Sequence, residues 1–497
     1  MEPYLLGIDI GTSGLKAAVF ARGGEVIASA SENYAVSYPQ PGWAEQDPEA
    51  WWQAACTALK KLFSGAVRAD EIAGIGIDGQ SWSAIAVDEN GKVLAPTPIW
   101  LDTRAKEICD RLNEKVGAER IFSLAGNSLQ PAYTTAKIAW YRENQPEVCR
   151  KTAKILQSNS FLAYRLTGVF SHDLSQGYGV HAFDMRNGCW DDVMCEALEI
   201  PREFLPKLYP CHEIIGTVTK KAAEETGLAA GTPVAAGGLD AACGTLGTGV
   251  LGAGETQEQG GQAGGMSVCI DRYAADPRLI LGYHTVPDHW LLQGGTTGGG
   301  GVLRWLKESV FSGEAFDSLT EEAEQVPAGS DGVIFLPYMA GERSPIWDPD
   351  AKGVFYGLDF NKTKGHLIRA ALEGTAFALR HNLETAEEAG VQAGVLRAMG
   401  GAANSVLWTQ IKADVTGHPI TVPSADTATT LGAAMLAGVG TGFYGSFREA
   451  VESTVRTVRT HEPNLRKKAV YDELYGRYRE LYERLKPVMD GAARTGI

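Results

Sequence analysis

The amino-acid sequence predicts an α/β protein made of two halves with similar architecture. Short apolar strands alternate with helical patterns up to about residue 235, which is typical of α/β folds. An apolar strand at residues 4–10 runs into a glycine-rich turn and carries an aspartate near its end. A second apolar strand at residues 233–236 runs into two glycines and Asp240. We interpret this echo as a duplication, with the boundary near residues 240–250.

The first elements form a strand, turn, strand pattern. Residues 4–10 and 14–20 are apolar and flank a Gly/Thr/Ser turn, and a Gly-Gly hairpin leads into a third strand at residues 25–28. Because a strand follows the glycines, the pattern weighs against the Rossmann and P-loop motifs, which need a helix there. Residues 47–49, Asp-Pro-Glu, then open a helix with an N-cap and a proline at its first position.

The later elements are predicted by periodicity and turn residues. The β-branched run at residues 72–77 indicates a buried strand, and an Asn-Gly turn predicts a hairpin over residues 85–94. Long helices are expected at residues 367–389 and 405–416. A final helix carries an apolar stripe that we interpret as packing, formed by Tyr471, Leu474, Tyr475, Tyr478, Leu481, Tyr482 and Leu485.

Composition and charge exclude several classes of protein. The chain has 497 residues and a formal net charge of −15, which argues against non-specific binding to nucleic acid or to an anionic membrane. The sequence has no apolar run near the ~20 residues that span a bilayer, and residues 1–4 do not begin a signal peptide. The eight cysteines form no CxxC pair, so reduced, buried thiols are expected rather than disulfides or zinc. A cytoplasmic location follows.

Glycine is the outlier in the composition. The chain has 59 glycines in 497 residues, against an average of about 7%. They cluster at residues 7–14, 237–265, 294–301 and 400–401. A glycine allows a tight turn or a close approach to a ligand, so four distant clusters predict several loops that converge on one ligand.

Five motifs, in a consistent order along nearly the whole chain, resemble the FGGY carbohydrate kinases and especially their xylulokinase-like branch. They lie at residues 7–13, at 137–140, at 342–349, at 353–373 and in the segments 400–414 and 431–434. The resemblance implies two duplicated actin-like (ribonuclease H-like) domains flanking an ATP cleft. We expect the domains at residues 1–244 and 245–497, with the nucleotide bound mainly by the second.

The resemblance also implies the roles of individual residues. Asp240 is expected to be the general base, although it could instead cap the following helix. Asp9 is expected to orient Mg²⁺ through a bridging water. The alternative is that its side chain stabilises the turn. The residues expected to bind nucleotide and phosphates are Gly11, Thr12, Ser13, Lys16, Gly261, Gln262, Gly300, Gly400, Gly401 and Asn404. For Lys16 a place on the strand surface is an equal alternative, and for Gly300 the alternative is tight packing.

The expected sugar site consists of Gln80, Ser81, Trp82, Asp102 and Asp240. Three departures from the family's pattern affect it and the phosphate site. Trp82 replaces a histidine and is either a sugar platform or a core aromatic, while Ala241 replaces an amide residue. The second phosphate loop has Gln262 and Ala263 where the family has two hydroxyl residues.

The predicted function is phosphorylation of a terminal hydroxyl of a small sugar with ATP and Mg²⁺. The expected substrate is a ketopentose such as D-xylulose, with a pentitol, another polyol or a deoxy-sugar as alternatives. A non-catalytic sugar- or nucleotide-binding regulator is a second hypothesis, motivated by the altered phosphate loop, and an actin- or chaperone-like ATPase is a third. The expected partners are the small sugar or polyol and a second copy in a homodimer, with no nucleic acid or membrane.

Overall fold

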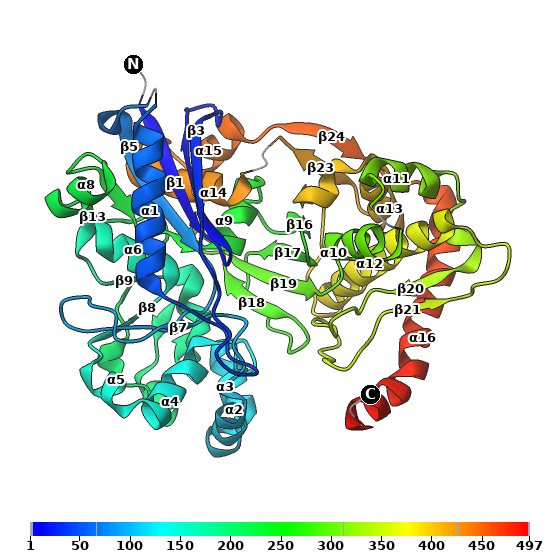
Figure 1. Cartoon of the computed structure of the whole chain (residues 1–497), viewed down its shortest axis with the longest axis horizontal. Helices are drawn as coiled ribbons and strands as arrows, with labels where there is room; N and C mark the ends of the chain where they lie inside the picture. The colour runs from blue at the N-terminus through cyan, green and yellow to red at the C-terminus, as the bar shows by residue number, and fades with distance from the viewer. Residues whose placement is uncertain (1–2, 66, 312, 425–426, 496–497) are drawn as a thin grey trace.

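The computed structural model describes residues 3–65, 67–311, 313–424 and 427–495, and shows two lobes (Figure 1). Each lobe is built around a seven-stranded mixed sheet. The prediction of no signal peptide at residues 1–4 falls partly on Met1 and Glu2, which lie outside the described residues. The α/β class predicted from the alternating pattern is therefore correct.

The first sheet contains the predicted strand, turn, strand unit. β1 (Tyr4–Ile10) is antiparallel to β2 (Gly14–Phe20) and parallel to β5 (Ile72–Gly79). Asp9 pairs with Lys16 on β2 and with Asp78 on β5. A seventh strand, β15 (Gly238–Leu239), also pairs with β5. The order across the sheet is β13 (Ile214–Thr217), β14 (Pro233–Ala235), β5 (Ile72–Gly79), β1 (Tyr4–Ile10), β2 (Gly14–Phe20) and β3 (Val26–Asn33).

The second sheet repeats this topology. An antiparallel meander is followed by two parallel strands and an antiparallel edge strand, as in the first sheet, with one extra strand at the meander end. The order is β18 (Ile280–Tyr283), β19 (Trp290–Thr296), β17 (Gly264–Ile270), β16 (Thr256–Gly260), β22 (Leu396–Met399), β23 (Ile420–Pro423) and β24 (Thr457–His461). The duplication is therefore confirmed.

The echo from which the duplication was predicted was misread. β14 belongs to the first sheet, where Val234 pairs with Ile75 of β5, so the segment before Asp240 does not begin the second half. The true counterpart of β1, its turn and β2 is β16, residues 261–263 and β17. A short apolar strand followed by glycines has the same sequence pattern at any position in a sheet, and only its pairing partner distinguishes the positions.

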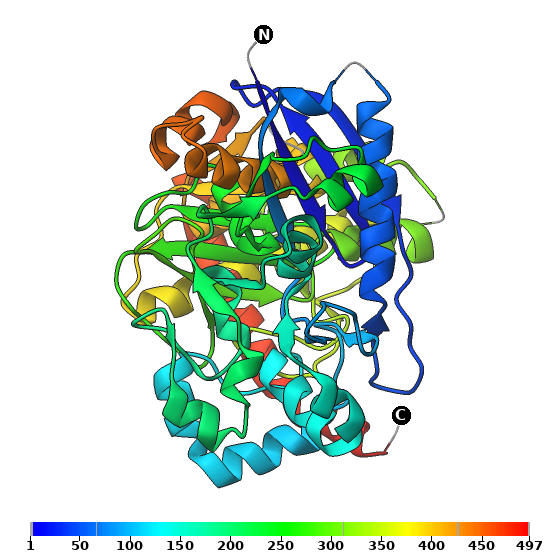
Figure 2. The same ribbon diagram turned by 90° about the vertical axis from the view of Figure 1, so that its left-hand side faces the viewer.

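Helices cover the first sheet and join the two lobes. α1 (Pro48–Phe63) is capped by Asp47 as predicted and runs along the strands of the first sheet (Figure 2). α9 (Asp240–Gly247) packs against α14 (Ala428–Gly440), and α14 also lies on β1 and β5. A helix late in the chain thus covers the first sheet. The two sheets are separated between residues 239 and 256, and the domain limits 1–244 and 245–497 stay a prediction.

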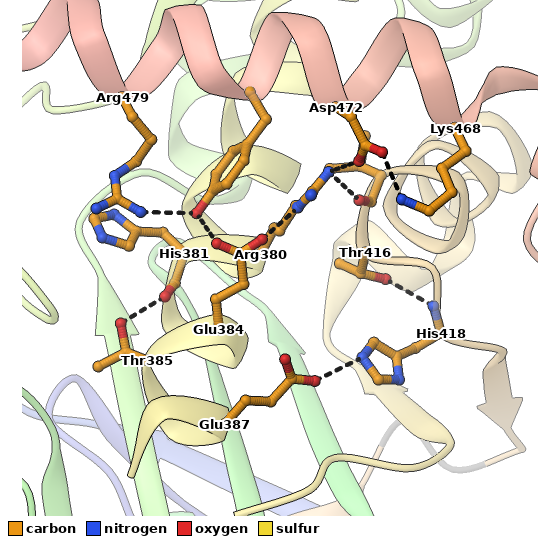
Figure 3. Close-up of polar contacts among 12 residues, drawn as sticks. Arg380, His381, Glu384, Thr385, Glu387, Thr416, His418, Lys468, Asp472 and Arg479 are labelled. Atoms are coloured by element: carbon orange, nitrogen blue, oxygen red, sulfur yellow. Dashed lines mark hydrogen bonds and ion pairs between the residues drawn. The ribbon is translucent and has the colours of Figure 1, made fainter. Parts of the chain in front are cut away.

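The second lobe is closed by three long helices. α12 (Lys364–Glu388) and α13 (Val406–Thr416) occupy the predicted segments, and α16 (Lys468–Thr495) buries its tyrosine stripe against them. Figure 3 shows the polar contacts at this junction. Arg380 of α12 donates hydrogen bonds to Glu384 of the same helix and to Asp472 of α16. The aromatic stripe is therefore packing, as predicted.

The remaining elements are short. The helices are α2 (Lys106–Leu112), α3 (Ala118–Ala125), α4 (Thr134–Asn144), α5 (Pro146–Lys151), α6 (Ser158–Thr167), α7 (Asp192–Ala197), α8 (Lys220–Thr226), α10 (Gly300–Trp305), α11 (Phe316–Glu324) and α15 (Phe447–Thr454). The strands are β4 (Glu45–Gln46), β6 (Ile85–Val87), β7 (Thr97–Pro98), β8 (Lys154–Leu156), β9 (Ser171–Asp173), β10 (Phe183–Asp184), β11 (Cys189–Trp190), β12 (Lys207–Tyr209), β20 (Ile334–Leu336) and β21 (Val354–Tyr356).

Two local predictions need qualification. The Asn-Gly turn is present, but its hairpin amounts to one bridge between Val87 and Val93, because β6 pairs mainly with β8. All eight cysteines are free, yet Cys189 is exposed and Cys149 half-buried rather than buried. Among the helices in the described part of the chain, none combines the length and apolar character needed to cross a bilayer.

Candidate active site

Three carboxyl groups meet at one edge of the first sheet. Asp9 lies near the carboxyl end of β1, and Asp78 is its direct neighbour on β5. Asp240 follows β15, which pairs with the end of β5, and it is the first residue of α9. The structure therefore brings together the predicted base and the predicted metal residue. Asp78 was missed, although an aspartate at the end of an apolar strand was the available signal.

The carboxyl groups have unusual acid strengths. Burial, helped by the negative charge of Asp9, raises the pKa of Asp240 to about 7. Burial also raises the pKa of Asp9, against the opposing effects of a hydrogen bond from Thr429 Oγ1 at 2.9 Å and the charge of Lys16. Asp78 is fully buried, and burial together with the negative charges of Asp9 and Asp240 raises its pKa well above the ordinary value.

This arrangement is suited to a cation. Mg²⁺ binds carboxylate oxygens and keeps several waters. Asp9 offers a half-buried carboxyl, and Asp78 beneath it has oxygens that lack any donor. The residues present therefore fit a magnesium ion. The Asp240 Oδ1 accepts the N–H of the adjacent Ala241 at 2.6 Å. Asp240 is not the N-cap residue of α9, so the alternative role of a helix cap is not seen.

The first predicted phosphate loop is the turn at residues 11–13. Its backbone is held from outside, because Tyr34 donates to the Gly11 carbonyl at 2.6 Å and Gln46 donates to the Thr12 carbonyl at 2.8 Å. The Thr12 hydroxyl accepts from Trp100 Nε1 at 2.9 Å, while Ser13 is exposed. The Gly11 N–H is engaged within the turn, where it donates to the Gly14 carbonyl at 3.0 Å. The loop is therefore a rigid turn that offers the amides of Thr12 and Ser13 and the Ser13 side chain.

Lys16 and Gln80 lie beside this loop. Lys16 stands on β2 opposite Asp9, and its charge acts on that carboxyl. The Gln80 amide is occupied by protein, since Nε2 donates to Gln46 at 2.8 Å and Oε1 accepts from Thr12 at 3.2 Å. In this structure the Gln80 side chain thus supports the phosphate loop. Its expected contact with the sugar stays a prediction.

Trp82 is the centre of an aromatic cluster. It is 7% exposed and has a φ of 58°, a left-handed conformation that is strained for an aromatic residue. Its ring lies 4.2 Å from that of Tyr133 and 5.7 Å from that of Tyr178, and its Nε1 has no partner among the described residues. Lys137 holds the Trp82 carbonyl with a hydrogen bond of 2.7 Å. The two tyrosines were missed because no local pattern marks them.

The other expected sugar residues are less available. Ser81 is half-buried, and no contact of its hydroxyl with a described residue is seen. Asp102 is 1% exposed and its carboxylate is bound by Arg104 at 2.8 Å and by the Ala44 N–H at 2.7 Å. Its oxygens are thus occupied by these donors, and the expected place of Asp102 near the substrate stays a prediction.

The second predicted phosphate loop, residues 261–263, is hydrogen-bonded to the start of α10. The Gly300 N–H donates to the Gly261 carbonyl at 2.7 Å, and the Gly301 N–H donates to the Gln262 carbonyl at 3.0 Å. The Gly300 amide is therefore engaged by the protein in this structure, as the alternative of tight packing expects, and its contact with a phosphate stays a prediction. Close packing explains the glycines, since a Cβ on Gly299 would lie 2.4 Å from Ala263.

A cavity of about 690 Å³ adjoins this loop, within the ~300–1,000 Å³ typical of small-molecule sites. Five of the predicted nucleotide residues line it, namely Gly261, Gln262, Gly300, Gly401 and Asn404. Gly400 lies behind them with a φ of 88°, and a Cβ there would be 2.8 Å from the Gly260 carbonyl oxygen. Apolar and charged side chains of α10, α11 and α13 complete the wall, including Arg304, Phe316 and Trp408.

Two duplicated lobes, an acidic cluster beside a tight glycine turn and a glycine-lined cavity define a phosphotransferase-type enzyme of the two-lobed sugar-kinase class. Comparison with known families agrees. Residues 4–247 match the model described as "FGGY family of carbohydrate kinases, N-terminal domain", and residues 272–441 match its C-terminal domain. The chain belongs to the FGGY family of carbohydrate kinases and is a sugar kinase.

Curated relatives and solved structures extend nearly the full length. The chain is 32% identical over 487 residues to a xylulose kinase of Escherichia coli (strain K12), covering 97% of this chain and 99% of that protein. It is 31% identical to a gluconokinase of Bacillus subtilis (strain 168), with 93% and 92% covered. The crystal structure of xylulose kinase from Rhodospirillum rubrum superposes with a TM-score of 0.92 at 32% identity, covering 98% and 100%.

Proposed function

We propose that this sugar kinase transfers the γ-phosphoryl group of ATP to a terminal hydroxyl of D-xylulose. The observation that carries the proposal is the position of Asp240, whose pKa of about 7 suits a general base at the edge of the acidic cluster. Xylulose kinases among the relatives, at 31–32% identity over nearly the full chain, support the choice of sugar.

Asp240 would accept the proton of the acceptor hydroxyl while that oxygen bonds to the γ-phosphorus and the bond to the ADP oxygen breaks. Phosphoryl transfer depends mainly on positioning and charge stabilisation, so a carboxylate and a rigid loop are sufficient protein contributions. Mg²⁺, when bound, would neutralise charge on the phosphates, and Asp9 would hold it, with Asp78 behind. The amides of Thr12 and Ser13 would support the transferring group.

ATP would occupy the cavity of the second lobe. Gly261, Gln262, Gly401 and Asn404 line this cavity together. The base of the nucleotide would lie beside Gly401 and Asn404, and its phosphates would lie beside the loop of Gly261 and Gln262. Trp82 and Tyr133 would form the apolar face of the sugar site. The cytoplasmic location and the homodimer remain predictions of the sequence.

A second acceptor is favoured by one observation, the similarity to gluconokinase at 31% identity. A polyol or deoxy-sugar is the other alternative acceptor, motivated by Trp82 in place of a polar group. The non-catalytic regulator is disfavoured because a binding protein has no need for a base such as Asp240, and the actin- or chaperone-like ATPase is disfavoured by the family match.

The test is a coupled ADP-release assay with Mg-ATP across ketopentoses, pentitols, tetritols, deoxy-sugars and D-gluconate. D-Xylulose is expected to stimulate ADP release most, and Asp240→Asn is expected to reduce the rate at least about 10²-fold while ATP still binds. Stimulation by another compound alone would replace D-xylulose as the substrate. If no compound stimulates release although ATP binds, the binding-protein hypothesis gains and the substitutions at Gln262 and Ala263 become its explanation.

A further inference from the structure

Arg343 is a half-buried cation without a partner. It lies in the loop between β20 and β21, and its guanidinium makes no hydrogen bond or ion pair with any residue in the described ranges. Other buried arginines of this chain are neutralised, as Arg104 is by Asp102 and Arg369 by Glu373. The nearest negative charge that acts on Arg343 is the carboxylate of its neighbour Glu342, which neither hydrogen-bonds nor ion-pairs with the guanidinium. The N–H donors of a half-buried guanidinium are therefore open to a ligand that supplies negative charge.

The backbone on both sides of Arg343 is fixed to the end of β19. The Glu342 carboxylate accepts the Thr297 N–H and the Arg343 N–H, each at 2.7 Å. The Ser344 hydroxyl accepts from the Gly295 N–H at 2.6 Å and donates to the Gly295 carbonyl at 3.1 Å. Residues 342–344 are therefore a rigid mount, and a rigid mount reduces the entropy lost when the side chain binds.

The guanidinium itself lies over Gly295. A Cβ built on Gly295 would be 3.3 Å from Arg343 Nη1, so any larger residue would crowd the arginine. Gly295 pairs with Gly265, the second residue of β17, and β17 begins directly after the second phosphate loop. Arg343 is thus mounted a short way along the sheet from the loop expected to hold the phosphates.

The first lobe faces this arginine with the aromatic cluster and the proposed base. Burial raises the pKa of Tyr133 and of Tyr178, and the charge of Arg343 opposes the rise in both. Tyr178 also feels the charge of Asp240. One phenol therefore lies within electrostatic range of both the proposed base and the unpaired arginine, which puts Arg343 on the acceptor side of the site.

We propose that Arg343 binds the phosphoryl oxygens as the group passes from ATP to the acceptor, and then the phosphate of the sugar product. The proposal rests on the proposed function. Its N–H groups would donate to non-bridging oxygens while the proton of the acceptor goes to Asp240, so the arginine itself gains and loses no bond. A planar guanidinium suits this role because it can donate two parallel hydrogen bonds to one phosphoryl group.

The test compares wild type with Arg343→Gln and Arg343→Lys by calorimetry, with D-xylulose, D-xylulose 5-phosphate and inorganic phosphate as probes. Arg343→Gln is expected to bind both phosphate probes at least about tenfold more weakly, with D-xylulose changed less than twofold. Its kcat should fall about 10²-fold or more, with a nearly unchanged sugar KM. Arg343→Lys should recover part of the phosphate affinity, because it keeps the charge but loses the fork.

Arg120→Gln is the matched control, since Arg120 lies exposed on α3, and it should behave as wild type. Unchanged phosphate affinity in Arg343→Gln would overturn the proposal, and so would an equal loss for D-xylulose and its phosphate. D-Gluconate is a fourth probe in the same calorimetry, and a selective loss of its binding would overturn the proposal as well, because Arg343 would then recognise a carboxylate of the acceptor. If wild type phosphorylates no sugar, the proposed function fails, while the inorganic-phosphate measurement still decides whether Arg343 is an oxyanion site.

Discussion

At the scale of single residues, the chemistry depends on carboxyl groups whose protonation is changed by burial. Asp240 has an ordinary pKa of 3.8 that burial and the neighbouring Asp9 raise to about 7. A carboxyl group with a raised pKa in the folded state binds a proton more tightly there than in the unfolded chain. Stability is therefore lost as the pH rises from about 4 to about 7, and is constant above that range.

Asp240→Asn should consequently stabilise the metal-free protein at pH 8. With one pKa unit worth about 1.4 kcal/mol, the gain could approach 4 kcal/mol as an upper value. Urea unfolding of both proteins from pH 4 to pH 8 measures it. The difference should be small near pH 4, where both side chains are neutral, and a constant difference across the range would contradict the assigned pKa.

Trp82 is the second residue with a clear experimental consequence. Its left-handed backbone costs about 1–3 kcal/mol and persists because Lys137 holds its carbonyl and Tyr133 packs on its ring. If the indole is a sugar platform, Trp82→Ala should raise the sugar KM about tenfold or more, since the variant loses aromatic contact with the ligand. Steady-state kinetics with each substrate varied in turn measures this.

The KM for ATP provides the internal control for Trp82→Ala and should change less than twofold, because the nucleotide cavity lies in the second lobe. An unchanged sugar KM would instead identify Trp82 as a core aromatic, the alternative already open from the sequence.

At the scale of elements, the contact between α9 and α14 is a close joint between the two halves. A Cβ on Gly432 of α14 would lie 1.9 Å from the Cys243 carbonyl oxygen of α9, and one on Gly247 would lie 1.9 Å from the Ala428 oxygen. α9 begins with Asp240, so this joint also determines where the proposed base stands. Helices meet this closely only where glycines remove the side chains between them.

Gly432→Ala should therefore cost about 1–3 kcal/mol of stability, because the backbones must separate to admit the methyl group. Urea denaturation at neutral pH measures the loss. Gly476→Ala on the exposed side of α16 is the matched control, since nothing lies within 4 Å of its Cβ. That change should stabilise the protein by about 0.5–1 kcal/mol, as expected for a glycine inside a helix. Equal effects of both substitutions would contradict this account of the joint.

At the scale of the whole molecule, the proposed reaction requires both lobes. The loop at residues 11–13 belongs to the first sheet, and the loop at residues 261–263 and the cavity belong to the second. A γ-phosphoryl group that reaches Asp240 from that cavity must be held from both sides. Closure of the lobes would also expel water that otherwise hydrolyses ATP.

The radius of gyration should thus decrease when D-xylulose and a non-hydrolysable ATP analogue are added together. Small-angle X-ray scattering measures this change directly. The ATP analogue alone should produce a smaller decrease, because the sugar contacts lie in the first lobe around Trp82 and Asp240. An identical radius in all three states would contradict closure.

Local patterns allowed much of the fold to be predicted. The strand, turn, strand unit at residues 4–20, the Asp47 cap, the two long helices and the tyrosine stripe all depend on neighbours in the chain, and each was correct. The family could also be predicted, because its motifs are short segments whose order along the chain is itself information.

What the sequence determined by itself was therefore the α/β class, the duplication, the family and the identity of the candidate acid groups. Only the tertiary structure decided which strand repeats β1, that Asp78 joins Asp9, that Gly300 and Asp102 are already occupied, and that the Arg343 guanidinium forms no hydrogen bond or ion pair within the described part of the chain. The physical reason is that propensity and spacing act between near neighbours in the chain. Pairing, burial and charge compensation arise largely between residues tens to hundreds of positions apart, and these determine which groups remain free for chemistry.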